Sequence, residues 1–467
     1  TMLQVLSAQK RKAIFAVPNN CLGPDEEEQH YQKWTAVEFK KLLKTYWTDV
    51  RVECIDDGFP RLLGVCGFPK PFKLAFTMPV KNEARDVERT LKSFRGVADY
   101  VVIGIDDKTT DNTAAIVEKY ADEVFYFTWQ NDFSAARNAC IEKCRPLLEQ
   151  DDWIFMSEGH ERLYAGADEL LKLGDVPKSI HVLEVRREER DYAWMFTWLF
   201  RNRPEIHYVN PVHNVLVYDD TKDCVAQLPK VATFHERHSE NAKERTVQRR
   251  GLNRKALTEK LLRDPKDARS CYYLGNEWRN VNVDKAIYYY ERYLALPTSK
   301  NGPERYQCRM QLAECYLRRV TAYERKAKAK EPPGDYGEEM AQRDLQAVYD
   351  TLIVASKDDW SRVEHWLQLG DFCYLQRKHE RAIKFYELAA TGVGREPMTY
   401  MWLDKGAYTY LPAQKLVMIY AEMGMLGDAL RWANRVPDLL PAWAPQQARD
   451  EAVAHRNALA EAVNAKK

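Results

Sequence analysis

Short apolar runs alternate with amphipathic stretches between residues 74 and 185. Each apolar run is four to seven residues long and rich in branched or aromatic side chains, which is typical of strands buried on both faces. The runs cover 74–80, 100–105, 123–127, 153–156 and 181–185, and the stretches between them predict helices over 84–94, 110–120, 134–148 and 166–172. This alternation predicts βαβ units in a mostly parallel sheet, in which ligands bind at the carboxyl ends of the strands.

A helical repeat replaces this pattern after about residue 265. Its clearest copy contains Trp366, Leu369, Gly370, Cys373, Ala382, Tyr386 and Ala389. Less complete copies begin near residues 274, 312 and 416, and the charged segment 323–343 interrupts one of them as a longer helix or an exposed loop. Small residues let two antiparallel helices approach closely, and the spacing resembles the tetratricopeptide repeat of about 34 residues. A generic helical bundle is the alternative.

The first 72 residues carry a weaker pattern. Residues 12–17 and 50–55 predict strands, 31–47 an amphipathic helix, and the Gly- and Pro-rich stretch 58–73 a linker. We therefore expect a β-α-β-like extension over 1–72, without an assigned role. The remaining boundaries are an α/β domain over 73–240, a basic linker helix over 241–265, and helical repeats over 266–467.

Composition and charge narrow the class of protein. Apolar residues make up 45% of the 467 positions, and 70 Lys and Arg nearly cancel 69 Asp and Glu, so no global field favours nucleic acid or membrane. No apolar run approaches the ~20 residues that cross a bilayer, and the first residues lack a signal-like apolar region. The ten cysteines include no CxxC pair. We expect a cytoplasmic protein with reduced thiols and no membrane partner.

Polar segments follow the first four strands, at residues 79–83, 106–113, 129–138 and 157–163. Carboxylates directly after a strand can accept hydrogen bonds from a nucleobase or ribose, and an arginine or a divalent metal can neutralise a pyrophosphate. Asp106, Asp132, Arg137 and the Glu158/His160 pair supply these groups. The polar residues of these segments also have structural alternatives. Asp111, for example, can be a helix cap, and Arg137 can form a surface ion pair.

Four motifs in this order resemble family 2 glycosyltransferases. These are V-K-N-E at 80–83, D-D-K-T-T-D-N-T at 106–113, N-D-F-S-A-A-R-N at 131–138 and W-I-F-M-S-E-G-H-E at 153–161. Downstream, F-R-N-R-P at 200–204, V-H at 212–213 and His235 also fit the family's pattern. The resemblance implies a GT-A fold and a nucleotide-sugar donor, usually a UDP-sugar, with Asp106 at the base and Arg137 at the nucleotide or the acidic motif. The implied donor-binding residues are Pro79, Val80, Lys81, Asn82, Glu83, Asp106, Asp132 and Arg137.

Two positions depart from the family. Its D-x-D metal motif is Glu158-Gly159-His160 here, and imidazole shifts the preference from Mg²⁺ towards Mn²⁺-class ions. With His213 as a third ligand, a Glu/His/His metal site results. The glutamate of the family's V-H-E segment is Asn214, so any acid–base role there is lost. An inverting transfer also needs a carboxylate that deprotonates the acceptor, and the candidates are Glu161, Glu188, Glu189 and Asp191.

Three functions stay open at this level. The leading one is a metal-dependent, inverting glycosyltransferase whose acceptor is a protein, a glycan or a modified DNA base, with repeats that bind the acceptor or mediate oligomerisation. The alternatives are a non-catalytic binding protein on a degenerate transferase fold and a scaffold built on the repeats. The basic stretch 237–266 is either a solvated helix or a patch that steers an anionic acceptor or covers the donor phosphates.

Overall fold

The computed structural model describes residues 13–18, 35–44, 49–55, 61–67, 72–219, 224–236, 238, 242–331, 336–441 and 444–465. It leaves out the side chains of 13–18, 49, 54, 55, 61, 65–67 and 242–248. The chain forms two compact units, one of Thr1–Glu189 and Met195–Leu252, the other of Arg190–Trp194 and Asn253–Lys467. The division falls within α7 (Ala242–Arg263), the helix that the sequence boundaries set apart as a linker.

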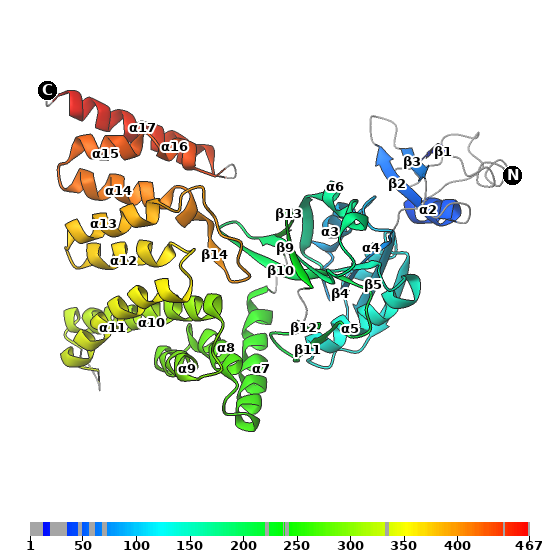
Figure 1. Cartoon of the computed structure of the whole chain (residues 1–467), viewed down its shortest axis with the longest axis horizontal. Helices are drawn as coiled ribbons and strands as arrows, with labels where there is room; N and C mark the ends of the chain where they lie inside the picture. Colours follow the sequence, from blue (N-terminus) through cyan, green and yellow to red (C-terminus); the bar gives the residue numbers. More distant parts are fainter. Residues whose placement is uncertain are drawn as a thin grey trace. The chain divides into compact units, whose positions relative to one another are not determined.

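A mostly parallel sheet forms the centre of the first unit, in the order β6-β5-β4-β7-β10-β9-β13-β8 (Figure 1). Strands β4 (Leu74–Val80), β5 (Tyr100–Asp106), β6 (Glu123–Phe127) and β7 (Trp153–Met156) run parallel, as predicted. The later strands are β8 (Glu161–Ala165), β9 (Val182–Glu188), β10 (Tyr192–Arg201) and β13 (Val225–His235). Of these, β10 runs antiparallel to β7, and β13 runs parallel to β9 and antiparallel to β8. Phe76, Phe94 and Phe155 pack together in the buried core.

The helices of this unit are shorter than the apolar pattern predicts. They are α3 (Val87–Ser93), α4 (Thr113–Val117), α5 (Phe133–Cys144) and α6 (Ala167–Leu170). Helix α4 begins late because Asp111 bonds to Thr113 instead of joining the helix: its carboxylate accepts the backbone N–H at 3.0 Å. Asp111 therefore lies just before the helix, whose cap position is occupied by Asn112 and not by Asp111, since short carboxylates compete with helical bonding at a helix start.

A small antiparallel sheet, in the order β1-β3-β2, precedes the main one. It consists of β1 (Ala13–Pro18), β2 (Asp49–Ile55) and β3 (Arg61–Gly67), with α2 (Ala36–Lys44) against it. The linker predicted over 58–73 is therefore wrong, because it contains the central strand β3. Gly64 contributed to the linker prediction because glycine is frequent in linkers. In the structure it lies within the strand, where a Cβ would be only 2.4 Å from Leu43. Residues 31–34 and 45–47 of the predicted helix lie outside the described residues.

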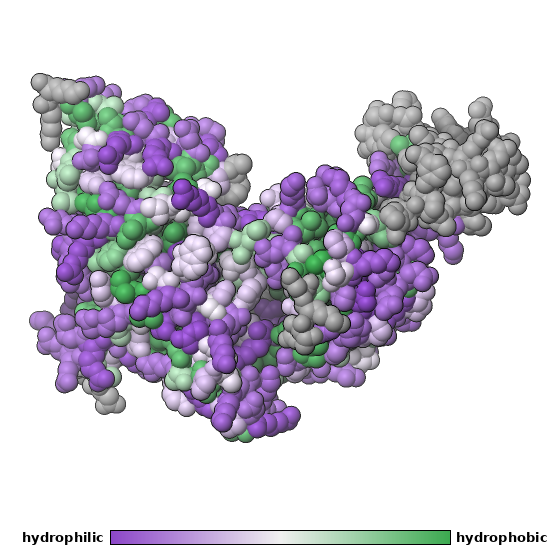
Figure 2. Space-filling view, viewed as in Figure 1, coloured by the Kyte–Doolittle hydropathy of each residue, from purple (hydrophilic) through white to green (hydrophobic). Residues whose placement is uncertain are grey.

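The second unit is a series of helical hairpins, which confirms the predicted repeat architecture (Figure 1). The pairs are α8 (Ala268–Trp278) with α9 (Val283–Ala295), α10 (Gly302–Lys328) with α11 (Glu338–Asp358), α12 (Glu364–Leu375) with α13 (His379–Ala390), and α14 (Leu411–Glu422) with α15 (Leu426–Ala433). The short α16 (Val436–Leu439) and the longer α17 (Gln446–Asn464) follow. Much of the charged segment 323–343 forms the ends of α10 and α11, which show as a hydrophilic area (Figure 2). Among the described residues, no helix is both long and apolar enough to cross a bilayer.

Glycine and tyrosine pairs lock two of these hairpins. A Cβ on Gly275 would lie 2.4 Å from the ring of Tyr290, and one on Gly370 would lie 2.4 Å from the ring of Tyr386. Both tyrosines are fully buried. The first helix of each hairpin thus needs glycine where the second inserts an aromatic ring, which is the physical basis of the repeat spacing in the sequence.

Gly370→Ala is expected to destabilise the second unit by about 1–2 kcal/mol. Alanine favours a helix interior by about 1 kcal/mol, but the added methyl group must displace the buried Tyr386 ring, which costs more. Hydrogen exchange of α12 and α13 amides in increasing denaturant measures the change in this unit. Gly427→Ala in α15 is the matched control, since nothing lies within 4 Å of its Cβ position, and it should be neutral or stabilising. Equal effects of the two substitutions would contradict the packing argument.

Candidate functional site

A pocket of about 220 Å³ lies at the carboxyl ends of β4 to β7, where the parallel sheet places ligands. Most of its lining comes from the strand ends and the loops after them, and one residue comes from α7. The lining residues are Pro79, Val80, Lys81, Glu83, Asp106, Phe127, Trp129, Phe133, Arg137, Glu158, Gly159, His160 and Arg249. Six of the eight predicted donor-binding residues are among them.

Asp106 ends β5 as a buried, charged hydrogen-bond acceptor. Its Oδ2 accepts a bond from Lys81 Nζ at 2.8 Å, and its Oδ1 accepts one from the backbone N–H of Lys108 at 2.9 Å. Burial alone would raise the pKa of this carboxyl, but these donors outweigh burial and lower the pKa. An ionised Asp106 can therefore accept a hydrogen bond from a ligand.

Three aromatic side chains in the same pocket escaped the sequence analysis: Phe127, Trp129 and Phe133. The rings of Trp129 and Phe133 meet edge to face, with centroids 4.7 Å apart. The sequence could have indicated them, because Phe127 is the last residue of β6 and the other two lie within the polar segment 129–138 that follows it. Flat aromatic surfaces beside a charged acceptor suit a nucleobase.

Two predicted donor residues shape loops and are not among the lining residues. Asn82 adopts a φ of 49°, which asparagine tolerates better than most residues, and its Oδ1 accepts the backbone N–H of Thr110 at 2.8 Å. Asp132 caps α5 by accepting the backbone N–H of Ala135 at 2.9 Å. Asp132 thereby fixes the first turn of α5, and Arg137 lies further along the same helix.

Arg137 presents a buried guanidinium with unused hydrogen-bond donors. Its side chain is 6% exposed, and its Nη2 donates to Glu158 Oε1 at 2.8 Å. Its Cζ lies 5.2 Å from the centre of the Tyr208 ring. Nε and Nη1 are buried without a hydrogen-bond partner among the described residues. Buried donors of a charged group are rarely left unpaired, so this arrangement favours an anionic ligand in the pocket.

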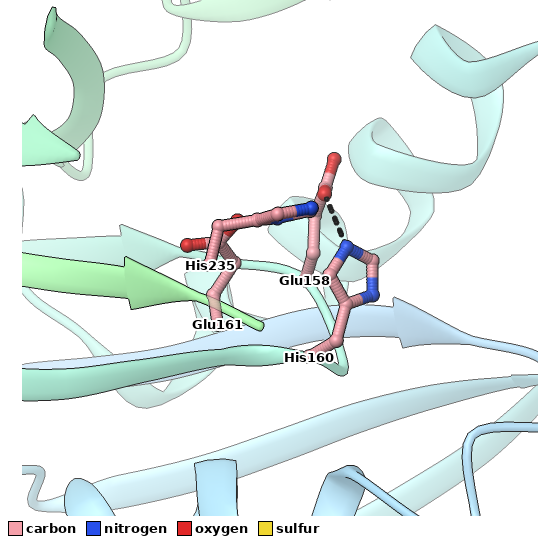
Figure 3. A group of neighbouring side chains, drawn as sticks. All are labelled: Glu158, His160, Glu161 and His235. Atoms are coloured by element: carbon pink, nitrogen blue, oxygen red, sulfur yellow. Dashed lines mark hydrogen bonds and ion pairs between the residues drawn. The ribbon is translucent and has the colours of Figure 1, made fainter. Parts of the chain in front are cut away.

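Four side chains bring possible metal ligands within 4.8 Å of one another: Glu158, His160, Glu161 and His235 (Figure 3). His160 Nε2 lies 3.2 Å from Glu158 Oε2, and His235 Nδ1 lies 2.5 Å from Glu161 Oε1. The imidazoles of His160 and His235 meet edge to face at 4.6 Å. Carboxylate and imidazole groups in this proximity match the donor set of Mn²⁺-class ions.

The carboxylates around His160 create a field that favours a positive charge. Burial would lower the pKa of His160, but contacts with Glu158 and Glu83 outweigh it and raise the pKa to about 9. The pKa of Glu158 is likewise held well below its usual value against the effect of burial, because His160, Arg187 and Arg137 stabilise its charged form. This part of the pocket therefore attracts a cation.

Glu161 is held at the base of this group by the sheet register. Strands β8 and β13 pair so that Glu161 lies opposite His235. Arg187 on β9 donates from Nε to Glu161 Oε1 at 2.7 Å, contacts it also through Nη2, and lies 2.7 Å from His235 Nδ1. Glu161 is completely buried. It therefore orients His235 through Nδ1 and leaves the imidazole Nε2 for another ligand.

Residues 76–156 match the family model described as glycosyl transferase family 2. Residues 76–156 are thus similar to a family 2 glycosyl transferase domain. The resemblance stated from the four motifs is thus confirmed, and with it the α/β GT-A class of the first unit.

Curated relatives match a little under half of this chain. A TPR repeat-containing protein of Synechococcus elongatus is 30% identical over 215 residues, 44% of this chain and 51% of that protein. The SPbeta prophage-derived glycosyltransferase SunS of Bacillus subtilis is 24% identical over 220 residues, 44% of this chain and 49% of that protein. The chain therefore spans about half the length of these curated relatives. Among solved structures, S. aureus TarS 1–349 is 13% identical, covers 60% of this chain and 91% of that chain, and has a TM-score of 0.30.

The remaining predicted residues of the transferase site are not all brought together. His213 lies outside the metal-capable group, in the turn between β11 (His207–Val209) and β12 (Val215–Val217), with a φ of 47°. His235 takes the place that the sequence analysis gave to His213. The register of the main sheet brings His235 on β13 to Glu161, while His213 lies in the turn of a separate two-stranded sheet.

The candidate bases differ in their surroundings. Glu161 is buried and bonded to Arg187 and His235, so it cannot reach an acceptor hydroxyl. Glu188 accepts a bond from Arg186 Nε at 2.5 Å. Glu189 has a 38% exposed side chain, and its Oε1 lies 4.0 Å from His235 Nε2. Asp191 belongs to the second unit, where its carbonyl accepts the backbone N–H of Lys405.

Gly159→Ala is expected to weaken Mn²⁺ binding at the group of Glu158, His160, Glu161 and His235 about tenfold to hundredfold. A Cβ at Gly159 would lie 3.0 Å from Glu83 Cγ and 3.2 Å from Val80 Cγ1, which pushes Glu83 from its place 3.6 Å from His160 Nδ1. Supporting residues of this kind usually contribute that much to metal affinity. Calorimetric titration with Mn²⁺ measures it. Gly251→Ala is the control, since nothing lies within 4 Å of that Cβ position, and an unchanged affinity in Gly159→Ala would contradict the role of Glu83.

Proposed function

We infer that this chain transfers a sugar from a UDP-sugar to an acceptor hydroxyl, with inversion at the sugar carbon and with the help of a divalent metal. One observation carries the inference. A single pocket holds an ionised acceptor at Asp106, a buried arginine with unpaired N–H donors at Arg137, and a metal-capable cluster at Glu158 and His160. These are the three groups that a nucleotide diphosphate requires.

The donor has a natural orientation in this pocket. The base lies against the aromatic side chains and bonds to Asp106, while the diphosphate lies between Arg137 and the metal-capable cluster. Arg137 can then use its unpaired Nε and Nη1 on phosphate oxygens in a paired, directional contact. The sugar is left pointing away from the base end of the pocket, towards the side of Glu158 and His160.

The residues present fit a divalent ion. Glu158, His160 and His235 Nε2 would hold it, while Glu161 and Arg187 orient His235. When bound, such an ion neutralises the diphosphate leaving group and so lowers the barrier to sugar transfer. The two imidazoles favour Mn²⁺ over Mg²⁺.

Glu189 is the carboxylate that we assign as the base. It is the exposed member of the predicted set beside His235, and a base must reach the acceptor hydroxyl from the face opposite the leaving group. The carboxylate takes the proton of the acceptor hydroxyl, and the acceptor oxygen displaces UDP from the sugar carbon in a single step. Such a displacement inverts that carbon. The acceptor belongs to the same proposal: a protein, a glycan or a modified nucleic acid, with the helical repeats as its binding surface or as an oligomerisation surface.

We also propose that the protein resides in a reducing compartment. Seven cysteines whose side chains the structure describes are buried and form no disulfide with one another: Cys140, Cys144, Cys224, Cys271, Cys308, Cys315 and Cys373. Buried free thiols are typical of proteins in the cytoplasm.

A nucleotide screen tests the proposed function. Thermal stability is measured with UDP, GDP, ADP, CDP and UDP-sugars, each with Mn²⁺, with Mg²⁺ and with EDTA. We expect a metal-dependent rise in melting temperature that is selective for uridine nucleotides, followed by donor hydrolysis or transfer. No shift with any nucleotide would remove the transferase proposal and return the weight to a non-catalytic binding protein.

A further inference from the structure

Arg249 stands apart from the other residues of the donor pocket. The others come from residues 79–160, whereas Arg249 comes from α7, which begins seven positions after His235. Both α7 up to Leu252 and the pocket belong to the first unit. The exposed guanidinium of Arg249 therefore lies in the pocket without being part of the sheet's own motifs.

The other positive charges of the pocket already have acidic partners. Lys81 is paired with Asp106 at 2.8 Å, and Arg137 with Glu158 at 2.8 Å. His160 lies between Glu158 and Glu83. Arg249, by contrast, makes no hydrogen bond or ion pair with any residue that the structure describes. It is the lining cation whose charge is left for a ligand.

The rest of α7 uses its basic residues differently. Arg254 stacks on the ring of Trp278 at 4.9 Å, and Lys260 pairs with Asp267 at 3.1 Å. Asn253 donates to Glu277 at 2.7 Å. Two basic residues of this helix, Arg254 and Lys260, thus contact α8 or the residue that precedes it, and the composition of α7 alone would not single out Arg249.

We propose that Arg249 binds the diphosphate of the donor and makes the site selective for nucleoside diphosphates over monophosphates. The proposal rests on the proposed donor chemistry. The UDP that leaves the sugar carries more negative charge than a divalent ion cancels, and the planar guanidinium can contact two phosphate oxygens at once. The same contact favours departure of the diphosphate, because Arg249 stabilises the charge that develops on it during transfer.

Binding of UDP and UMP, each with Mn²⁺, tests this role by calorimetry. Arg249→Ala is expected to weaken UDP binding about tenfold to hundredfold and UMP binding much less, as for a lost charge-assisted contact. Arg249→Lys keeps the charge but not the two-pronged contact, and it should fall between Arg249→Ala and the unchanged protein. Arg250→Ala is the matched control, since Arg250 is the neighbouring arginine and does not line the pocket.

Each outcome separates this proposal from the one it rests on. If the unchanged protein binds UDP and Arg249→Ala binds it equally well, the role of Arg249 is refuted and the transferase proposal stands. If Arg249→Ala weakens UDP and UMP to the same extent, the arginine contributes only general attraction and the diphosphate assignment is wrong. If the unchanged protein binds no UDP at all, the proposed donor chemistry fails, and the assignment of Arg249 fails with it.

Discussion

Alanine at His160 or at His235 is expected to abolish donor turnover and to weaken Mn²⁺ binding by about 100-fold or more. Each substitution removes a nitrogen ligand, whereas loss of a mere supporting residue already weakens metal binding about tenfold to hundredfold. His235→Ala has a second effect, because Glu161 and Arg187 lose the imidazole that they orient. Calorimetry with Mn²⁺ and a donor-hydrolysis assay measure the two effects.

The matched control for this experiment is His213→Asn. Asparagine tolerates the left-handed backbone that His213 adopts, so the loop should keep its conformation. The cluster of four residues predicts normal metal binding and turnover in this variant, whereas the motif-based set of Glu158, His160 and His213 predicts their loss. Retained turnover in His160→Ala and His235→Ala, with the fold intact by circular dichroism, would remove the metal site altogether.

The sequence predicts the elements of the catalytic unit because each is encoded locally. Four of the five expected strands coincide with β4, β5, β6 and β7 to within one residue, since a buried parallel strand is a continuous apolar run. Helix starts were less predictable. Helix α3 begins at Val87 rather than at residue 84, after a loop in which Asn82 Oδ1 accepts the backbone N–H of Thr110 and Glu83 donates its backbone N–H to Thr113 Oγ1. Such side-chain bonds are not visible in periodicity.

The residues of the candidate site also differ in whether local sequence or long-range pairing brings them together. Glu158 and His160 share one loop, so spacing alone finds them. His235 lies 74 positions beyond Glu161, and Arg187 lies 26 positions beyond it, so only the pairing of β8, β9 and β13 brings them together. A strand register of this kind depends on long-range pairing that a single sequence does not contain. His213 was chosen because it stands in a motif, and it is not part of the group of four that the structure brings together.

A second buried charge cluster ties together the helices of the repeat unit. Arg362 and Glu364 have side chains 2% and 8% exposed, and Arg362 Nη2 donates to Glu364 Oε1 at 2.5 Å. Tyr306 of α10 and Tyr408 both donate to Glu364 Oε2, at 3.3 and 2.7 Å. Burial alone would raise the pKa of Glu364, but the Arg362 guanidinium and the Tyr408 hydroxyl lower it. The carboxylate is thus the charged centre that joins α10, α12 and the turn at Tyr408.

Glu364→Ala is expected to destabilise the repeat unit by about 3–5 kcal/mol, because it leaves the Arg362 guanidinium buried without a counterion. Hydrogen exchange of α10 and α12 amides in increasing denaturant measures it, since two units make a single unfolding midpoint ill-defined. Glu380→Ala on exposed α13 is the control and should change stability by less than about 0.5 kcal/mol. The double variant Arg362→Met/Glu364→Ala should be more stable than the two single losses added together, because removing both charges removes the unpaired one. Strict additivity, or a loss in Glu364→Ala no larger than in the control, would show that the cluster is not a coupled ion pair and that the helices are held by apolar packing alone.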